Sequence, residues 1–236
     1  MKPTITVVIP ALNEEKYIEK TLRSLRRQSV KIEIIVVDNG SKDRTMEISR
    51  EIADKVFSYT EKKGPLFAAN YGFERASAEI IAMAGADCIY PPKWAERVLK
   101  AFKSEEIVGV YGPVRFFDSN PLMNFLSGLF YEIFMLSTKL LNVDNTSGAN
   151  FAFRKSIYLQ INDFVNSWTT IAEDIEIGKR LKKHGKLVLL PFNFSYTSAR
   201  RFQKNGYIKS AFTFLREWIH FKHKKGNIKI EDYWDK

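Results

Sequence analysis

Polar side chains stand where three predicted β-strands end. Asn13 and Glu14 follow the first apolar run, Asp38 ends the second, and Asp87 follows the fourth. In open α/β sheets a ligand binds beyond the carboxyl ends of the strands, so we expect these side chains to converge. A carboxylate in that position is able to accept a hydrogen bond from an N–H group of uracil or guanine. The convergence is the first indication of a functional site.

The elements that must position these residues alternate between strand and helix patterns. Short apolar β-branched runs predict strands at residues 5–9, 32–37, 55–59 and 79–84. Helical periodicity separates them, at residues 14–28, 43–53 and 66–76. Strands joined by helical crossovers predict an α/β fold with a mostly parallel sheet and helices on both faces.

Composition bounds the domain organisation. With 236 residues and 45% hydrophobic residues, the chain is expected to form one large domain over residues 1–200 and a basic, aromatic extension over residues 201–236. Cys88 is the single cysteine, which excludes an intrachain disulfide and favours a reducing compartment. We find no signal-peptide pattern in residues 1–10 and no apolar run long enough for a membrane span. A cytoplasmic protein is expected, with peripheral attachment to the inner face of the membrane as one option.

A net charge of +10 indicates an anionic partner. Nucleic acid, a phosphate-bearing substrate and an anionic membrane all fit that charge. The alternative is a lysine-rich solvated surface, which composition alone does not exclude.

Five segments in a fixed order resemble the family 2 glycosyltransferases of the GT-A fold. They are residues 8–15 (VIPALNEE), 36–45 (VVDNGSKDRT), 86–87 (AD) followed by 91–94 (PPKW), 147–154 (SGANFAFR) and 172–176 (AEDIE). Each segment is a weak signal alone, but the ordered set covers most of the chain. The resemblance implies a smaller acceptor-side part of the fold and inverting transfer of a sugar from a nucleotide-diphosphate-sugar to an acceptor hydroxyl.

At the nucleotide end, the resemblance implies that Asp38 accepts a hydrogen bond from the base imide. It implies a nucleotide-binding set made of Pro10, Ala11, Asn13, Glu14, Asp38, Gly40, Lys63 and Ala86. Two alternatives stay open: Asp38 caps a turn and the helix that follows it, and Lys63 belongs to a solvated surface.

At the metal end, the resemblance implies a divalent cation, Mn or Mg, bridging the diphosphate. The family usually supplies two aspartates here, whereas this chain has Gly85-Ala86-Asp87. Asp87 keeps the position that touches the metal, and its alternative is a loop residue or helix cap before Pro91. Arg200 and Arg201 resemble the family's diphosphate-binding arginines, and guanidinium groups suit phosphate oxygens.

For the reacting end, the resemblance implies that Asp174 is the general base, with Glu173 beside it in the catalytic pair. A carboxylate suits the role because the acceptor hydroxyl loses its proton mostly in the transition state. The alternative is two acids placed at a helix N-terminus, where the helix dipole favours negative charge. Gly148 and Asn150 are assigned to the sugar or acceptor by their place in the fourth segment.

Two amphipathic segments bear on the acceptor. Residues 121–142 predict a helix with a wide apolar face, either packed on the sheet or lying at an interface with a lipid-linked acceptor. Residues 202–225 mix aromatic with basic side chains, a composition that suits an anionic membrane surface. No nucleic-acid-binding motif is present, so a membrane is favoured over nucleic acid. Processive members of the family carry a Gln-x-x-Arg-Trp signature, and this Trp is missing after Arg200-Arg201. The resemblance therefore implies that one sugar is added per encounter.

Two other functions compete with sugar transfer. A nucleotidyltransferase would open with a Gly-rich phosphate loop, and residues 10–14 contain no glycine. A catalytically weak nucleotide-sugar-binding protein is the other alternative, since Gly85 stands where the family has its first metal-binding acid. Release of nucleoside diphosphate in the presence of metal would separate a live site from a dead one.

Overall fold

The computed structural model describes residues 3–140, 143–167, 173–207 and 209, with only the backbone described at 164, 166, 167, 173, 174 and 205. The strands are β1 Ile5–Ala11, β2 Ile32–Asp38, β3 Lys55–Ser58, β4 Ile80–Met83, β5 Cys88–Ile89, β6 Ile107–Tyr111, β7 Val114–Phe116, β8 Phe151–Arg154, β9 Lys186–Leu189 and β10 Ser195–Thr197. The helices are α1 Ile18–Arg26, α2 Thr45–Ile52, α3 Pro65–Glu74, α4 Trp94–Ala101, α5 Pro121–Leu140, α6 Lys155–Ile161, the 3₁₀ helix η1 Asn162–Ser167, α7 Glu173–Leu181 and α8 Arg200–Asn205.

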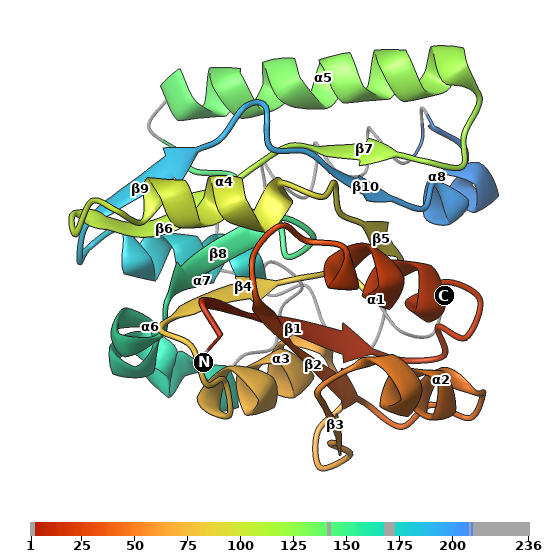
Figure 1. Cartoon of the computed structure of the whole chain (residues 1–236). Coiled ribbons are helices and arrows are strands. Elements are labelled where there is room, and N and C mark those ends of the chain that lie inside the picture. The colour runs from red at the N-terminus through yellow and green to blue at the C-terminus, as the bar shows by residue number, and fades with distance from the viewer. Residues whose placement is uncertain (1–2, 141–142, 168–172, 208, 210–236) are drawn as a thin grey trace.

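The main sheet has seven strands in the order β3-β2-β1-β4-β8-β6-β9 (Figure 1). Its neighbouring strands run parallel except where β8 pairs antiparallel with β4 and with β6. The predicted α/β class and mostly parallel sheet are confirmed, and the first four strands lie where their apolar runs predicted them. The reversed strand β8 was not predicted.

Two hydrophobic cores lie on opposite faces of this sheet, because successive side chains of a strand point to opposite faces. On one face, Val8 and Ile35 pack with buried side chains of α3, α6 and α7. On the other, their neighbours Val7 and Ile34 pack with α1 and α4, and α2 adds partly buried side chains. Both faces are covered, which explains why the strands read as continuous apolar runs.

A second, three-stranded sheet in the order β5-β10-β7 lies beside the main sheet. Helix α5 packs along β7 at the edge of the molecule (Figure 1). Only Gly128, Met135 and Thr138 of this helix are buried. The helix therefore packs on a sheet along one side, as one of the two alternatives predicted, but its other side remains apolar and exposed.

Within the part of the chain that the structure describes, no helix has both the length and the apolar character needed to cross a membrane. The predicted basic, aromatic segment begins in α8, and residues 210–236 lie outside the described residues. The predicted extension over residues 201–236 therefore stays a prediction.

Candidate active site

Asp38 ends β2 and is 1% exposed. Its Oδ2 accepts hydrogen bonds from the backbone N–H groups of Gly40 and Ser41, each at 3.0 Å, so this oxygen caps the turn. Its Oδ1 is buried and has no hydrogen-bond partner. Buried polar atoms are rarely left without a partner, and such an oxygen is suited to an N–H donor brought by a ligand. The capping alternative thus accounts for one oxygen and leaves the other without a partner, and the nucleobase role of Asp38 stays a prediction.

Several hydrogen bonds join the turn after β1 to the turn after β2. Asn13 has a positive φ of 55°, donates its N–H to Ser41 Oγ at 2.9 Å and accepts the N–H of Lys42 on Oδ1 at 2.8 Å. The N–H of Glu14 bonds to Thr45 Oγ1 at 2.7 Å. Because these backbone groups are held in the turn, α1 begins at Ile18 and not at residue 14 as predicted. The turn brings Glu14 to the edge of the sheet that carries Asp38.

Asn39 connects this edge to the following loop. Its Nδ2 donates to the carbonyls of Tyr59 and Lys62, and its Oδ1 accepts the N–H of Gly64 at 2.9 Å. These bonds fix the loop that carries Lys63, whose side chain is exposed. Sequence reasoning gave Asn39 no role, although a buried amide after a strand end is a signal for loop anchoring.

Glu14, Asp87 and Arg200 form a cluster of opposite charges. Arg200 Nη2 pairs with Glu14 Oε1 and lies 3.1 Å from Asp87 Oδ2. The Arg200 guanidinium also lies over the Tyr17 ring, 4.7 Å from its centroid. Burial raises the pKa of Glu14, although the hydrogen bond from Arg200 opposes that rise. Its second oxygen, Oε2, is buried without a partner. The structure thus joins residues predicted for the nucleotide, the metal and the diphosphate.

Gly85 and Ala86 lie in a tightly packed turn before Asp87. A Cβ atom at Gly85 would lie 2.7 Å from Cys88 Sγ, so a carboxylate there would require Cys88 to move. The N–H of Gly85 donates to the Tyr90 hydroxyl, which in turn donates to the carbonyl of Ala149 at 2.9 Å. The predicted nucleotide residue Ala86 accepts a hydrogen bond from Thr21 Oγ1 through its carbonyl. This turn is therefore bonded to the segment predicted to bind the acceptor.

The sequence model of the family "Glycosyl transferase family 2" matches residues 6–161 of the 236 residues. The chain belongs to glycosyl transferase family 2.

Family 2 relatives and a solved structure support this placement. The chain is 28% identical over 194 residues to 4,4'-diaponeurosporenoate glycosyltransferase of Staphylococcus haemolyticus, covering 76% of this chain and 52% of that protein. It is 24% identical over 237 residues to dolichol-phosphate mannosyltransferase of Pyrococcus furiosus, covering 95% of this chain and 65% of that one.

The solved structure of mannosyltransferase PcManGT from Pyrobaculum calidifontis in complex with GDP-Man and Mn2+ has the same fold. Its TM-score is 0.65 at 20% identity, with 84% of this chain and 58% of that chain covered. The GT-A fold predicted from the sequence is confirmed. The chain spans between about half and two thirds of the length of these three proteins.

A divalent cation in this family 2 chain would need several oxygen ligands. Among the residues that the structure describes, no group of three or more His, Cys, Asp and Glu side chains is arranged to hold a metal ion. Asp87 and Glu14 supply two carboxylates near each other, both paired with Arg200. Burial raises the pKa of the Cys88 thiol to about 12, so it stays protonated and is a poor ligand. These residues fit a cation that takes its remaining oxygen ligands from a diphosphate and water.

The segment predicted to bind sugar or acceptor has two different environments. Asn150 is 3% exposed, accepts the Trp94 Nε1–H on Oδ1, and donates through Nδ2 to the carbonyls of Pro113 and Asn193. Its amide is thus engaged within the protein and holds strands together. Gly148 is half-buried, and a Cβ there would lie 3.0 Å from the Met83 side chain. The acceptor role of both residues stays a prediction.

Glu173 and Asp174 begin α7. Their side chains lie outside the described residues, so the predicted base is placed only by its backbone. The helix itself is held on the sheet by the buried side chains of Ile177 and Leu181. Arg201, in the first turn of α8, is exposed beside the clustered Arg200.

Thr197 is a residue of the site that sequence reasoning missed. It ends β10, and its Oγ1 donates to Asp87 Oδ1 at 3.3 Å. The backbone N–H of Ser198 also bonds to the Asp87 carbonyl at 3.2 Å. A threonine at the end of a three-residue strand carries little signal, because its partner lies 110 positions earlier in the chain.

Proposed function

We propose that this protein is an inverting glycosyltransferase that moves one sugar at a time from a nucleoside-diphosphate sugar to an acceptor hydroxyl. The observation that carries the proposal is the unpartnered Oδ1 of Asp38, linked through the Asn13–Glu14 turn to the cluster of Glu14, Asp87 and Arg200. Membership of glycosyl transferase family 2 supports it. The combination offers an acceptor for a base N–H and charged groups for a diphosphate.

In the proposed complex, Asp38 accepts the imide N–H of uracil or guanine, and Pro10 and Ala11 form the wall at the end of β1. Arg200 and Arg201 bind diphosphate oxygens, because a guanidinium group forms paired hydrogen bonds with phosphate. Lys63 approaches the same phosphates from the loop held by Asn39.

The transfer itself is a displacement at the anomeric carbon. The acceptor hydroxyl gives its proton to the Asp174 carboxylate as its oxygen forms a bond to the anomeric carbon. The bond from that carbon to the diphosphate breaks, and its electron pair leaves with the nucleoside diphosphate. Attack from the face opposite the leaving group inverts the configuration.

We propose that a divalent cation, Mn or Mg, binds to Asp87 together with the diphosphate, with Glu14 beside it. When bound, such a cation neutralises charge on the leaving diphosphate. The similar mannosyltransferase structure is a complex with Mn2+, which supports this choice. Arg200 pairs with the Asp87 carboxylate, and in this proposal its guanidinium also binds the diphosphate.

We propose further that the acceptor is lipid-linked and is met at an anionic membrane surface. The name of the Pyrococcus furiosus relative, dolichol-phosphate mannosyltransferase, supports a lipid-linked acceptor. The net charge of +10 supports attraction to anionic lipids, each basic residue near the surface contributing ~1 kcal/mol. Cosedimentation with anionic liposomes should occur at low salt and weaken at high salt. Equal binding to neutral liposomes would contradict the electrostatic part of this proposal.

A catalytically weak nucleotide-sugar-binding protein is the second candidate. The absence of a carboxylate at Gly85 and the lack of a three-ligand metal cluster among the described residues favour it. It predicts nucleotide binding without turnover.

The experiment that separates the two candidates is release of nucleoside diphosphate from a panel of UDP- and GDP-sugars with Mn2+. Metal-stimulated release that is lost in Asp87→Asn is expected for the enzyme. Asp163→Asn is the matched control, because Asp163 is an exposed carboxylate that pairs with Arg180. Binding of a nucleotide-sugar without release at any metal concentration would leave the second candidate standing.

A further inference from the structure

An apolar cavity of about 540 Å³ lies between α5, β7, β10 and α8. Its wall is formed by Val114, Arg115, Phe116, Met123, Leu126, Ser127, Phe130, Tyr131, Ser147, Ala149, Thr197, Phe202 and Tyr207. This volume lies within the range of about 300–1,000 Å³ that is typical of small-molecule sites. Nothing in the proposed chemistry at Asp38 or Asp174 requires an apolar cavity of this size.

The cavity shares residues with the candidate active site. Thr197 lines it and donates a hydrogen bond to Asp87. Ser147 and Ala149, from the segment predicted to bind the acceptor, line it as well. The Ala149 carbonyl accepts the hydroxyl proton of Tyr90, which also binds the turn at Gly85. A molecule that fills the cavity and extends past Thr197 therefore reaches the carboxylate of Asp87.

The part of the cavity wall beside Thr197 is aromatic, because Phe116 on β7 pairs with Thr197 on β10. Phe116 lies against Phe202 with ring centroids 4.9 Å apart, and Tyr207 closes the group. The Tyr207 hydroxyl bonds to Ser119 Oγ, which satisfies its polar end. Arg115 pairs with Glu132, its Nε 3.1 Å from Oε1, so its charge is compensated. An alkyl or isoprenoid chain suits such walls, whereas a sugar would leave its hydroxyls without partners.

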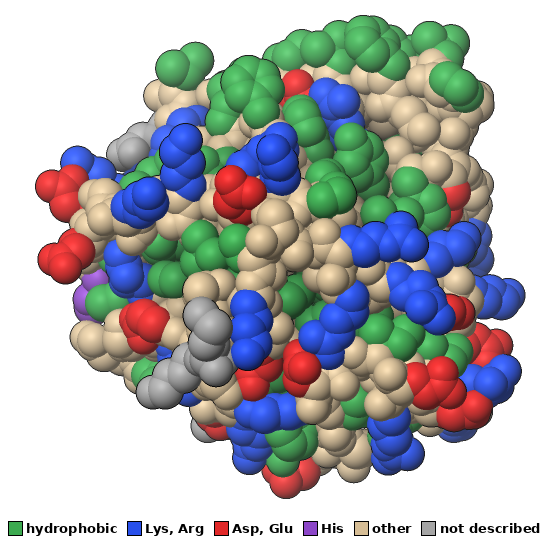
Figure 2. Space-filling model, viewed as in Figure 1, with side chains coloured by type: hydrophobic (Ala, Val, Ile, Leu, Met, Phe, Trp, Pro, Cys, Tyr) green, Lys and Arg blue, Asp and Glu red, His purple; other side chains and the backbone are tan. Residues whose placement is uncertain are grey.

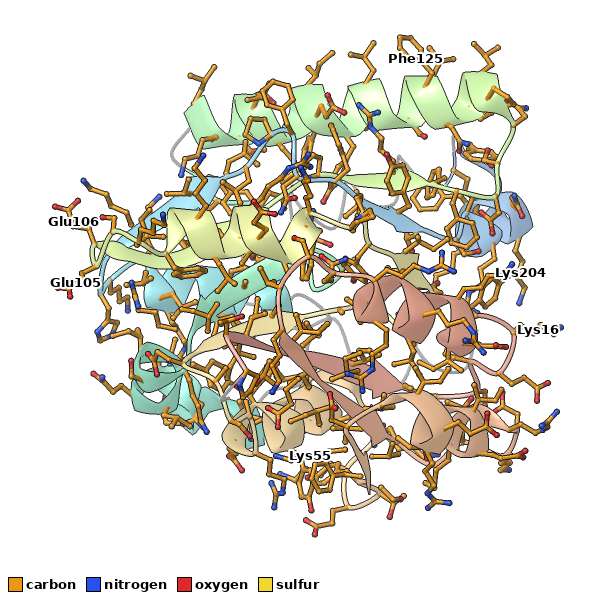
Figure 3. The ribbon with its side chains drawn as sticks, viewed as in Figure 1. Lys16, Lys55, Glu105, Glu106, Phe125 and Lys204 are labelled. Carbon is orange, nitrogen blue, oxygen red and sulfur yellow. The ribbon has the colours of Figure 1, made fainter. Side chains whose placement is uncertain are left out.

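The cavity wall continues into the exposed side of α5. Leu126 and Phe130 line the cavity and are also 45% and 51% exposed. They join an outward apolar row made of Leu122, Phe125, Leu129, Ile133, Leu136 and Leu140. Figure 2 shows hydrophobic side chains gathered along this edge of the molecule, and Phe125 points away from the body in Figure 3. A contiguous exposed apolar surface of this kind marks a binding or membrane-contact face.

We infer that this cavity holds the hydrocarbon chain of the acceptor, which enters along α5 and presents its terminal oxygen beside Thr197 and Asp87. The inference rests on the proposed function and specifies its acceptor as a primary alcohol on a long apolar chain. The hydrocarbon chain contributes affinity because its apolar surface is removed from water. The part of the cavity wall that is shared with the candidate active site positions the reacting oxygen.

The probe is a series of straight-chain primary alcohols from butanol to decanol, titrated calorimetrically into the full chain with saturating nucleoside diphosphate. Each methylene that becomes buried should tighten Kd roughly fourfold until the cavity is filled. Ser127→Phe places a phenyl ring at the cavity wall and should weaken decanol binding at least about tenfold.

Ser137→Phe is the matched control. Ser127 and Ser137 both lie on α5 and both bond to carbonyls of their own helix, but Ser137 is exposed and is not part of the cavity wall. Ser137→Phe should bind decanol as the wild type does, and both variants should bind nucleoside diphosphate within about twofold of wild type. If thermal unfolding shows that Ser127→Phe does not fold, Leu126→Ser carries the same expectation of weaker decanol binding.

A flat dependence on chain length, or equal decanol binding by Ser127→Phe and wild type, would overturn the inference. So would a wild-type dimer that Ser127→Phe converts to a monomer in sedimentation, because a second copy would then fill the cavity. These results leave nucleotide-sugar turnover untouched. The proposed function fails separately, if no nucleotide-sugar is bound or hydrolysed.

Discussion

Replacing Asp38 with asparagine tests the nucleotide site with the smallest possible change. Oδ2 of Asp38 is engaged by the N–H groups of Gly40 and Ser41, whereas Oδ1 has no partner. The amide oxygen of the substituted side chain can keep the two turn bonds. Its NH₂ group then takes the place of Oδ1 and presents a donor where the acid presented an acceptor.

The expected cost follows from that exchange. A hydrogen bond to a charged group contributes ~1.5–3 kcal/mol, so UDP and GDP should bind about tenfold to a hundredfold more weakly. The imide nitrogen of uracil or guanine is a donor, but the corresponding nitrogen of cytosine is an acceptor. CDP should therefore lose much less affinity, and the preference for UDP over CDP should shrink or reverse. Stability should change by less than about 1 kcal/mol, since the turn keeps its cap and one unpartnered buried atom replaces another.

Titration calorimetry of UDP, GDP and CDP against wild type and Asp38→Asn gives the three affinities, and thermal unfolding checks the fold. Asn39→Asp is a useful comparison, because the Asn39 side-chain amide donates to the carbonyls of Tyr59 and Lys62 and does not lie at the unpartnered Oδ1 of Asp38. That variant should lose stability with an unchanged preference among bases. Equal weakening of all three nucleotides by Asp38→Asn would refute base recognition by Asp38 and leave only its capping role.

Three other outcomes are expected. Asp174→Asn should lower single-turnover transfer by ~10²–10⁴-fold with nucleotide binding nearly unchanged, and transfer within about tenfold of wild type would exclude it as the base. Mn2+ should strengthen binding of nucleoside diphosphate in wild type but not in Asp87→Asn, whereas tight binding of Mn2+ to the protein alone would contradict a site shared with the diphosphate. Hydrogen bonds from Lys55, Thr6 and Ser77 outweigh burial and lower the pKa of Glu33 to about 2. The lowered pKa stabilises the fold above pH 4.5, and that stability should be lost as pH falls from 4.5 toward 2. In urea unfolding, the free energy of unfolding that is lost between pH 4.5 and 2 should be about 1–3 kcal/mol smaller for Glu33→Gln than for the wild type.

The strands and the polar residues at their ends were predictable because local patterns encode them. The apolar run at residues 32–37 fixes β2, and a turn former directly after it places Asp38 at the sheet edge. Family motifs then single out Asp87 and Arg200. What the local pattern does not encode is their contact: Arg200 and Glu14 are 186 positions apart and meet only because α8 follows β10 at the second sheet.

Asn150 and α5 illustrate a different limit. An asparagine in a Gly-Ala-Asn segment looks the same in sequence whether it faces a sugar or holds two carbonyls, and only the packing of Trp94 and Asn193 around it distinguishes these roles. Helical periodicity likewise predicts an apolar side for α5. It does not predict that this helix buries only three residues and shares Leu126 and Phe130 with a cavity, because both depend on the distant strand β10 and helix α8.

For the proposed nucleotide and metal site, the charges around Asp87 predict the order in which the two ligands bind. A side chain at Gly85 is opposed by Cys88 Sγ, and Cys88 is fully buried with its N–H bonded to Thr21, so the turn favours glycine there. The remaining carboxylates, Asp87 and Glu14, both pair with Arg200, whose single positive charge compensates one of their two negative charges. A cation approaching the protein alone must displace that arginine and gains few ligands in return.

A diphosphate offers Arg200 new acceptors and brings oxygens of its own, which releases Asp87 for the metal. Nucleotide should therefore bind before the metal or together with it, and Arg200→Gln should raise the affinity of Mn2+ for the protein without nucleotide while weakening that of the nucleoside diphosphate.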